Sequence, residues 1–495
     1  MTLHKPRRTT LDKDLDKFTY VEEATAFLSR SRIALGVGAL FLVATTAAGA
    51  VFFSGHPHVL MLTLALAIGG YMALNIGAND VSNNMGPAVG ARAMTMGGAL
   101  LLAAVCEAAG ALLVGSNVVA TISSRLLDVS AFSSPPAFAL AMMSALVAAA
   151  VWINVATLIG APVSTTHAVV GGVVGAGIGA AGTVAVETGT LVAIAFSWLV
   201  TPVIGGICAA LLLAAIKAGI SEREDKIGAA RCWLPVLFGV MSGTFVLYLL
   251  TVAPPATLDL SSSASAGLAA LAALCGGGLS VPLVRASARG LENRNQSLRQ
   301  LFRVPLIAAA AILSFAHGAN DVANAVGPVA AIFTALQFAP SALPGGSGLP
   351  VLAIAAVGIS FGIMLFGPRL VRMVGERITR LNPIRGFCVV LATASVVLVA
   401  SALGLPVSST HIAVGAVFGV GFFREWSTNR ARVRSVIGME PEANVGFRRR
   451  WRREAADMRR RRLVRRAHVL TIVTAWMVTV PASALLAAVI HYLLA

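Results

Sequence analysis

Long apolar stretches, each separated from the next by a short polar segment, dominate the chain. A helix needs about 20 predominantly apolar residues to cross the hydrocarbon core of a bilayer. Thirteen stretches are of about this length. They predict an all-helical polytopic membrane protein with about 12–13 spans, at residues 33–54, 60–78, 97–119, 136–158, 163–183, 191–216, 235–251, 264–284, 304–332, 350–367, 385–403, 406–423 and 467–492.

The composition agrees with this pattern. Apolar residues make up 57% of the 495 positions, and Asp, Glu, Lys and Arg together only 12%, whereas a soluble domain carries about 25% charged residues. The mean hydropathy is +0.83. These values exclude a disordered chain, a soluble enzyme and an ordinary nucleic-acid-binding protein. We therefore expect no enzymatic activity, no cofactor and no nucleic-acid partner.

The basic residues are gathered outside the apolar stretches. The net charge is +17, from 38 Lys and Arg against 21 Asp and Glu, and only Arg92 and Arg125 lie outside five basic blocks. An even number of predicted spans separates consecutive blocks, so all five can face the cytoplasm, where Lys and Arg accumulate. This predicts a plasma (inner) membrane protein with its N-terminus in the cytoplasm and its C-terminus outside. The blocks are residues 1–32, 217–231, 285–303, 369–385 and 424–466.

The blocks and spans also predict how the chain is divided. Residues 1–32 are too long and too acidic for a cleaved signal peptide. The fifteen Arg of 424–466 are interpreted as a topology signal that contacts anionic lipid head groups, with a regulatory contact as the alternative. The expected segments are an N-terminal cytoplasmic extension (1–32), an extra transmembrane helix (33–54), a first transport repeat (60–216), linking spans and basic loops (217–303), a second transport repeat (304–423), an Arg-rich cytoplasmic loop (424–466) and a C-terminal transmembrane helix (467–495).

Two polar strings occur twice in the chain, in the same order. Gly-Ala-Asn-Asp-Val-x-Asn begins at Gly77 and again at Gly318, and each copy continues to a Gly-Pro pair, with eight of eleven positions identical. Pro-Val-Ser-x-Thr-His ends at His167 and again at His411. Because the two strings lie at nearly the same spacing in each half, they indicate a duplicated unit.

The predicted topology makes the two copies antiparallel. The span that ends in the first string runs from outside to inside in one half and in the opposite direction in the other. Inverted repeats of this kind are typical of secondary transporters, whose binding site lies near the bilayer midplane where the copies meet. Alternating access then follows from rocking of one repeat against the other.

The first string places a carboxylate inside an apolar span in each copy. Asp80 and Asp321 are each preceded by an Asn and followed three residues later by another. A charge at the bilayer centre costs about 2.5–3.5 kcal/mol on insertion scales, so it should face a cavity and have a partner. Carboxylate and amide oxygens are ligands that suit Na⁺, and a carboxylate could equally carry a proton. The structural alternative is that these Asn and Asp residues cap a broken helix. We expect helix interruptions at the Gly-Pro pairs. We assign Asp80 and Asp321 to ion coupling, as candidate Na⁺ ligands. The predicted substrate ligands are the amides of Asn79, Asn83, Asn320 and Asn324.

The second string has the pattern of a helix start. Pro162 and Pro406 suit an early helical position and the following Ser or Thr suits the cap. The free N–H groups of such a start bind anions, and two facing starts would enclose a small tetrahedral oxyanion with neutral donors. The predicted substrate hydroxyls are those of Ser164, Thr165, Thr166, Ser408, Ser409 and Thr410.

Three further polar residues lie within the predicted spans. His167 and His411 follow the hydroxyls directly, and either could titrate or support the turn through a hydrogen bond. Glu107 lies inside the third span. An intramembrane carboxylate is a functional candidate, and its alternative is a hydrogen bond between helices. We assign Glu107 to ion coupling and the two His residues to a supporting role.

The paired strings resemble those of the inorganic phosphate transporter (PiT) family, over residues 60–492. The resemblance implies uptake of inorganic phosphate coupled to Na⁺ or H⁺, an inverted-repeat core with helical hairpins, and a homodimer. Two departures stand out. Val390 occupies a position where many family members carry a second Glu, which bears on the ion stoichiometry. Ser82 and Asn84 replace the usual Ala residues and add polar groups that could tune selectivity.

Other functions compete with phosphate import. Some relatives resemble sulfate permeases, so a sulfate or other oxyanion permease is the alternative; because phosphate changes protonation near neutrality, its uptake should depend on pH in a way that sulfate uptake would not. An intramembrane aspartyl protease using Asp80 and Asp321 is a remote alternative. The two membrane carboxylates favour it, but a catalytic dyad would not explain why the Asn residues and the Ser/Thr-His string are repeated with them. A structural scaffold has no reason to duplicate costly intramembrane polar groups.

Overall fold

The computed structural model describes residues 33–159, 163–252, 260–338, 349–373, 381–437 and 466–495. Over these residues the protein is almost entirely helical, with one isolated β-bridge between Leu127 and Val186. Eleven of the described helices are long and apolar enough to cross a membrane. The predicted fold class, an all-helical multi-pass membrane protein, is therefore confirmed.

The first half of the chain begins with the helix Ile33–Phe52. The following helices carry the first copy of the two polar strings. They are α2 (Val59–Gly90), α3 (Met96–Val114), α4 (Ser116–Ser124), α5 (Pro135–Ile159), α6 (Thr165–Ala181) and α7 (Thr188–Ile216), with a single π-helical turn at Lys217–Ser221 and short 3₁₀ turns at Val129–Ala131 and Thr183–Ala185.

The second half begins with a linking hairpin and then carries the second copy. The hairpin is formed by α8 (Lys226–Val252) and α9 (Ser262–Ser287), which pack against each other. The remaining helices are α10 (Asn295–Leu301), α11 (Arg303–Asp321), α12 (Ala323–Ala335), α13 (Leu349–Met373), α14 (Pro383–Ala402), α15 (Ser409–Ile437) and α17 (Arg466–Leu494).

Several predicted spans differ in form from a simple crossing helix. The stretch 163–183 is the 17-residue helix α6, about 26 Å long, which is shorter than the ~30 Å hydrocarbon core. It packs against α5, as the second arm of a helical hairpin would. The stretch 406–423 is the start of α15, which continues into the basic block that follows it.

The predicted interruption at the Gly-Pro pairs is wrong. Both α2 and α12 continue as helices through Pro87 and Pro328, and the break in the second copy lies instead at Val322, between α11 and α12. A proline removes one helical hydrogen bond, to the carbonyl four residues earlier, and neighbouring membrane helices can support the rest. The carbonyls of Asn83 and Asn324 therefore lose their helical donors, although the helices persist.

The two copies interlock by exchanging helices. α2 of the first copy packs against α13 of the second, and α11 of the second packs against α3 of the first. At each contact the glycine of the first string touches the partner backbone: a Cβ atom at Gly77 would collide with the carbonyl oxygen of Ile359, and one at Gly318 with that of Glu107. The glycines thus permit a backbone approach that a larger residue would prevent.

A second pair of contacts has the same register. A Cβ atom at Gly110 would collide with the carbonyl of Phe315, and one at Gly362 with the carbonyl of Leu74. Phe315 lies six residues before Asp321, and Leu74 lies six residues before Asp80. The two interfaces are therefore equivalent, residue by residue.

The same exchange joins the helices that follow the second string. α6 packs against α17, and α15 packs against α7. Gly175 approaches the backbone of Ala484, as Gly419 approaches that of Gly206. α17 is thus the counterpart of α7, and the predicted boundary of the second repeat at residue 423 leaves this helix out.

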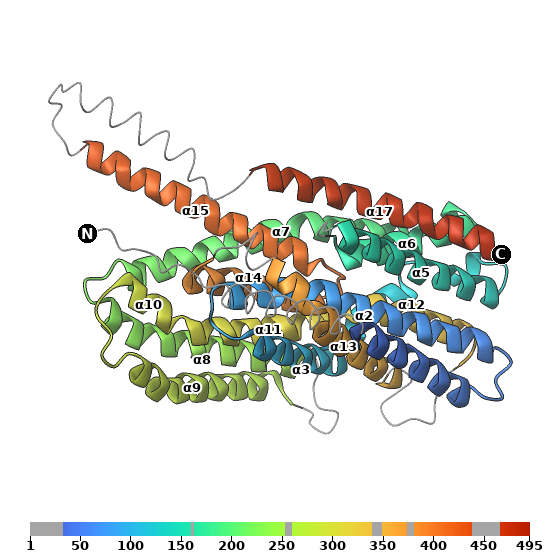
Figure 1. Cartoon of the computed structure of the whole chain (residues 1–495), viewed down its shortest axis with the longest axis horizontal. Coiled ribbons are helices and arrows are strands. Elements are labelled where there is room, and N and C mark those ends of the chain that lie inside the picture. Colours follow the sequence, from blue (N-terminus) through green and yellow to red (C-terminus); the bar gives the residue numbers. More distant parts are fainter. Residues whose placement is uncertain (1–32, 160–162, 253–259, 339–348, 374–380, 438–465) are drawn as a thin grey trace, which may run out of the picture.

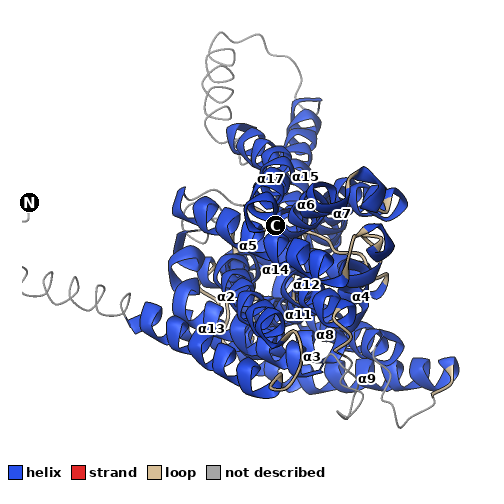
Figure 2. Ribbon diagram, turned by 90° about the vertical axis from the view of Figure 1, so that its right-hand side faces the viewer, coloured by secondary structure: helices blue, strands red, loops and turns tan. Residues whose placement is uncertain are grey.

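The counterpart helices run in opposite directions. In Figure 1, α2 runs leftward from the turn at the right-hand end, whereas α11 and α12 run rightward from α10. The α7–α8 and α9–α10 junctions, which carry two of the basic blocks, both lie at the left-hand end. In Figure 2, α11, α12 and α14 lie in the centre of the bundle and α9 at its edge.

We expect Gly318→Ala to lower the stability of the folded protein, because the new Cβ atom meets backbone rather than a flexible side chain. Overpacking of this kind costs about 1–3 kcal/mol. The measurement is thermal unfolding of the purified protein in detergent. Gly267→Ala on α9 is the matched control, since nothing lies within 4 Å of its Cβ position, and its Tm should be unchanged or slightly higher. Equal Tm values for both variants would contradict the proposed close packing.

Candidate functional site

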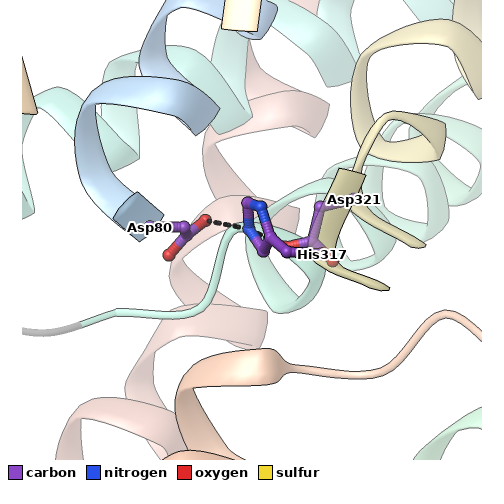
Figure 3. Close-up of side chains that lie close together, drawn as sticks. All are labelled: Asp80, His317 and Asp321. Carbon is purple, nitrogen blue, oxygen red and sulfur yellow. Dashed lines mark ion pairs between the residues drawn. The ribbon is translucent and has the colours of Figure 1, made fainter. Parts of the chain in front are cut away.

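The inverted repeats bring the two Asp residues of the first string together. Asp80 lies within α2, and Asp321 is the last residue of α11. With His317 they form a buried group whose ligand atoms all lie within 4.8 Å of one another. Figure 3 shows the imidazole of His317 between the two carboxylates.

His317 contacts three carboxylates from three helices. Its Nε2 atom lies 2.9 Å from Asp321 Oδ2 and 3.8 Å from Asp80 Oδ2, and its Nδ1 atom lies 2.9 Å from Glu107 Oε2. All four side chains are buried. Sequence reasoning missed this residue, although its position four residues before Asp321, on the same helix face, was a usable signal.

Asn84 completes this cluster. Its Nδ2 atom donates to Glu107 Oε1 at 2.8 Å, so both oxygens of this carboxylate have a partner within the bundle. Asn84, which replaces the usual Ala of the first string, therefore lies beside Glu107.

The equivalent positions in the other half are apolar. Gly77 and Gly318 contact Ile359 and Glu107 in the same way, so Ile359 is the counterpart of Glu107, and by the same register Ile76 is that of His317. Ala325 likewise corresponds to Asn84. Val390 lies on α14 and is not the counterpart of Glu107.

The second string starts a helix in both copies, as predicted. α6 begins at Thr165 and α15 at Ser409, and the preceding serines cap them: Ser164 Oγ accepts from His167 N, and Ser408 Oγ accepts from His411 N. The assignment of Pro406 to an early helical position is wrong, because it precedes the cap. Its carbonyl instead accepts from Trp198 Nε1 at 2.9 Å. Pro162 lies outside the described residues.

Each first string is hydrogen-bonded to the second string of the other copy. Asn83 Nδ2 donates to Thr410 Oγ1 at 2.8 Å, and Asn324 Nδ2 donates to Thr166 Oγ1 at 3.2 Å. Asn83 and Asn324 are counterparts, as are Thr410 and Thr166. The site is therefore assembled from both repeats and exists in neither alone.

The two Asp residues differ in their surroundings. Asp80 Oδ2 accepts from Thr165 Oγ1 at 2.9 Å, and its Oδ1 accepts from Asn79 Nδ2 at 3.0 Å. Asp321 Oδ1 has no hydrogen-bond partner among the described residues, and neither has Oγ of Ser409, the counterpart of Thr165. Three buried oxygens are thus without partners on one side of the site, the third being Asn324 Oδ1.

The side chain of Asn320 is hydrogen-bonded to the segment before the second helix start. Its amide nitrogen donates to Ser401 Oγ and to the carbonyl of Leu405, and its oxygen accepts from Val407 N. These contacts hold the segment that leads into α15. The Asn320 amide thus positions the second helix start, and its predicted role as a substrate ligand stays a prediction.

The two His residues of the second strings meet where the copies join. The rings of His167 and His411 lie 4.3 Å apart between centroids, and Trp198 lies 3.8 Å from His167. This aromatic contact places the two helix starts side by side. The other predicted residues lie in the charge cluster, in the two helix starts or in the hydrogen bonds that join the repeats: Asn79, Asp80, Asn83, Glu107, Ser164, Thr165, Thr166, His167, Asp321, Asn324, Ser408, Ser409, Thr410 and His411.

Comparison with known proteins identifies the family. The model of the phosphate transporter family matches residues 76–487, which include both copies of both strings and most of α17. A candidate phosphate permease of Helicobacter pylori is 42% identical over 513 residues, which cover 95% of this chain and 96% of the Helicobacter pylori protein. The chain belongs to the phosphate transporter family.

Two further proteins are similar along most of the chain. The chloroplast inorganic phosphate transporter 2-1 of Arabidopsis thaliana is 37% identical over 399 residues, covering 75% of this chain and 68% of the plant protein. A solved structure of a sodium-dependent phosphate transporter superposes with a TM-score of 0.74 at 33% identity, covering 88% of this chain and 99% of the other. The predicted resemblance to this family is confirmed.

The asymmetry of the cluster leads to a stability prediction. Replacing Glu107 or His317 alone by Ile should destabilise the protein, because breaking a buried ion pair costs about 3–5 kcal/mol. The triple variant Asn84→Ala/Glu107→Ile/His317→Ile reproduces the apolar trio of the other half and should recover most of the lost stability. Thermal unfolding in detergent measures both effects. A triple variant less stable than either single one would show that the two halves are not equivalent in packing.

Proposed function

We propose that this protein imports inorganic phosphate together with a cation, by alternating access of its two inverted repeats. The observation that carries the proposal is the exchange of hydrogen bonds between the repeats, from Asn83 to Thr410 and from Asn324 to Thr166. One site then depends on both copies, as in inverted-repeat transporters. The names of the relatives support phosphate as the substrate.

In this proposal phosphate is held by neutral donors. α6 and α15 both start at the site, and the first N–H groups of a helix attract anions. The hydroxyls of the second strings add further donors, and Ser409 Oγ has no competing partner among the described residues. No Lys or Arg is among the buried residues of the described chain, so phosphate would have no basic side chain beside it.

The unpartnered oxygens beside Asp321 favour Na⁺ as the coupling ion. They are Asp321 Oδ1 and Asn324 Oδ1, which have no hydrogen-bond partner among the described residues. Oxygens of this kind are the ligands that hard cations prefer. Three carboxylates face one imidazole in the cluster, so a charged His317 can neutralise only one of them. A proton is the competing coupling ion, and neither choice requires an organic cofactor.

The proposed setting is the plasma (inner) membrane, with the N-terminus in the cytoplasm and the C-terminus outside. The clustering of two basic blocks at one end of the bundle supports this orientation. The homodimer and the lipid contacts of the Arg-rich loop stay predictions. Residues 438–465 of that loop lie outside the described residues.

Two other functions are less well supported. A sulfate permease is the second candidate, because neutral donors accept any tetrahedral oxyanion of suitable size. An aspartyl protease fits poorly, because its two carboxylates share one proton directly, whereas His317 Nε2 lies between Asp80 and Asp321. That placement suits a charge cluster in a transporter rather than a catalytic dyad.

The test is uptake of radiolabelled phosphate into proteoliposomes of the purified full chain, with Na⁺ and pH gradients imposed separately. We expect an inward Na⁺ gradient to drive uptake and excess sulfate not to compete. Asp80→Asn and Asp321→Asn should each abolish this uptake, because an amide keeps the shape of the carboxylate but not its charge.

The matched control for these variants is Asp128→Asn. The carboxylate of this partly exposed residue bonds only to Ser130 among the described residues, so the change should leave uptake unchanged. Uptake driven by a pH gradient alone would replace Na⁺ by a proton, and competition by sulfate would favour the second candidate. Full Na⁺-driven uptake by either Asp variant would contradict the coupling role.

A further prediction concerns Ser409. Ser409→Ala should raise the KM for phosphate by about tenfold, the loss expected for one hydrogen bond to a charged group, with little change in Tm or in the Na⁺ dependence. Thr165→Val is the comparison, because it removes a hydroxyl that already bonds to Asp80 and should lower Tm as well. Unchanged phosphate uptake kinetics in Ser409→Ala would remove this hydroxyl from the phosphate site.

A further inference from the structure

A stripe of polar residues runs along one face of α2, beyond the site itself. Tyr71, Asn75, Asn79 and Asn83 lie four residues apart, so they share one face of the helix over about 18 Å. All four side chains are partly exposed, whereas Asp80 beside them is buried. The stripe joins the site to the half of α2 that is nearer its start.

The contacts of the stripe show which way it faces. The Tyr71 hydroxyl accepts from Asn154 Nδ2 on α5, Asn79 Nδ2 donates to the carbonyl of Val163 just before α6, and Asn83 donates to Thr410 at the start of α15. Asn75 lies between Tyr71 and Asn79 on the same face. The stripe is therefore directed at the helices that form the site, not away from them.

The second repeat lacks the outer part of this stripe. In the register of the repeats, Tyr71 and Asn75 correspond to Ile312 and Ala316, and Asn154 corresponds to Leu398. Ala316 is fully buried, as are Asn320 and Asn324 farther along the same face of α11. This face of the counterpart helix is thus an interior face, and polar groups extend along it beyond the site in one repeat only.

Polar side chains at membrane depth require a partner or water. They are found facing a bundle interior or a water-filled path, because contact with lipid is costly. Asn75 Nδ2 donates to the carbonyl of Tyr71, and Asn154 Nδ2 donates to the Tyr71 hydroxyl. Each amide therefore retains one N–H for an anion and its oxygen for a cation. Such groups can replace part of the hydration shell of both ions as they approach the site.

We propose that Tyr71, Asn75 and Asn154 line a one-sided polar access path that connects the phosphate site with the end of the molecule where α2 begins. This inference rests on the proposed function. In Figure 1 that end lies opposite the α7–α8 and α9–α10 junctions with their basic residues, so the path leads to the external side. The hydrogen bond between Tyr71 and Asn154 bridges α2 and α5 across it. The corresponding route in the second repeat is sealed by Ala316 and Leu398.

The test is the accessibility of single cysteines in the full chain. The five natural cysteines (Cys106, Cys208, Cys232, Cys275 and Cys388) are first replaced, by Ala at Cys388 and by Ser at the others. Asn75→Cys and Asn154→Cys are then compared with the matched controls Ala316→Cys and Leu398→Cys. A membrane-impermeant, positively charged methanethiosulfonate reagent is added to the external side of proteoliposomes or cells of known protein orientation.

We expect Asn75→Cys and Asn154→Cys to react about tenfold faster than their counterparts, because thiol modification follows exposure to water. Saturating phosphate should slow both reactions. Equal rates in the two repeats would overturn the one-sided path. Reaction from the cytoplasmic side only, or only with a lipid-soluble maleimide, would overturn it as well, by placing the path at the other end or the stripe against lipid.

Labelling and transport failures can be told apart. The labelling requires no transport, so it tests the path even if phosphate uptake is absent and the proposed function is wrong. For a transporting protein, Asn75→Leu/Asn154→Leu gives the second readout. It should slow phosphate uptake about tenfold while equilibrium phosphate binding in detergent stays unchanged, because the site itself is intact; an unchanged uptake rate would overturn the path.

Discussion

A charge inside the membrane needs a partner, and in this protein His317 supplies it. Its imidazole contacts Glu107, Asp80 and Asp321, which come from three helices of both repeats. The contact depends on the glycine next to it, because Gly318 lets α11 approach the backbone of α3 at Glu107. The close helix packing and the charge cluster are therefore one feature: the first sets the distance at which the second can form.

The two repeats share a backbone arrangement but not a chemistry. The α2–α13 and α3–α11 contacts have the same glycine register, yet one buries Ile76 and Ile359 where the other buries His317 and Glu107. The polar stripe of α2 also has no full equivalent on α11. Duplication thus supplied a symmetric frame, in which the two sides of the site could acquire different tasks while the helix packing stayed the same.

The sequence predicted the two helix starts at the site better than it predicted the helix packing. The polar strings repeat almost unchanged, so their residues and the helix starts at Thr165 and Ser409 could be found by comparing the chain with itself. α7 and α17 share no such string, and their equivalence appears only through the glycine contacts. The break at Val322, in place of the Gly-Pro pair, could not be predicted, because a proline inside a membrane helix is tolerated wherever neighbouring helices support it. The role of His317 depends on contacts between distant segments, which residue spacing does not reveal.

In the proposed mechanism, coupling follows from the absence of basic side chains. Phosphate would enter a site whose charge cluster places three carboxylates around the imidazole of His317. Two like charges about 4 Å apart repel by about 4 kcal/mol at an effective dielectric constant near 20. Neutral hydroxyls and helix N–H groups can orient the anion but cannot cancel that repulsion. A buried Arg would cancel it permanently and would allow phosphate to bind without an ion. A cation that must bind beside Asp321 cancels it only when present, so the anion and the cation depend on each other for occupancy, and this dependence is what a symporter requires.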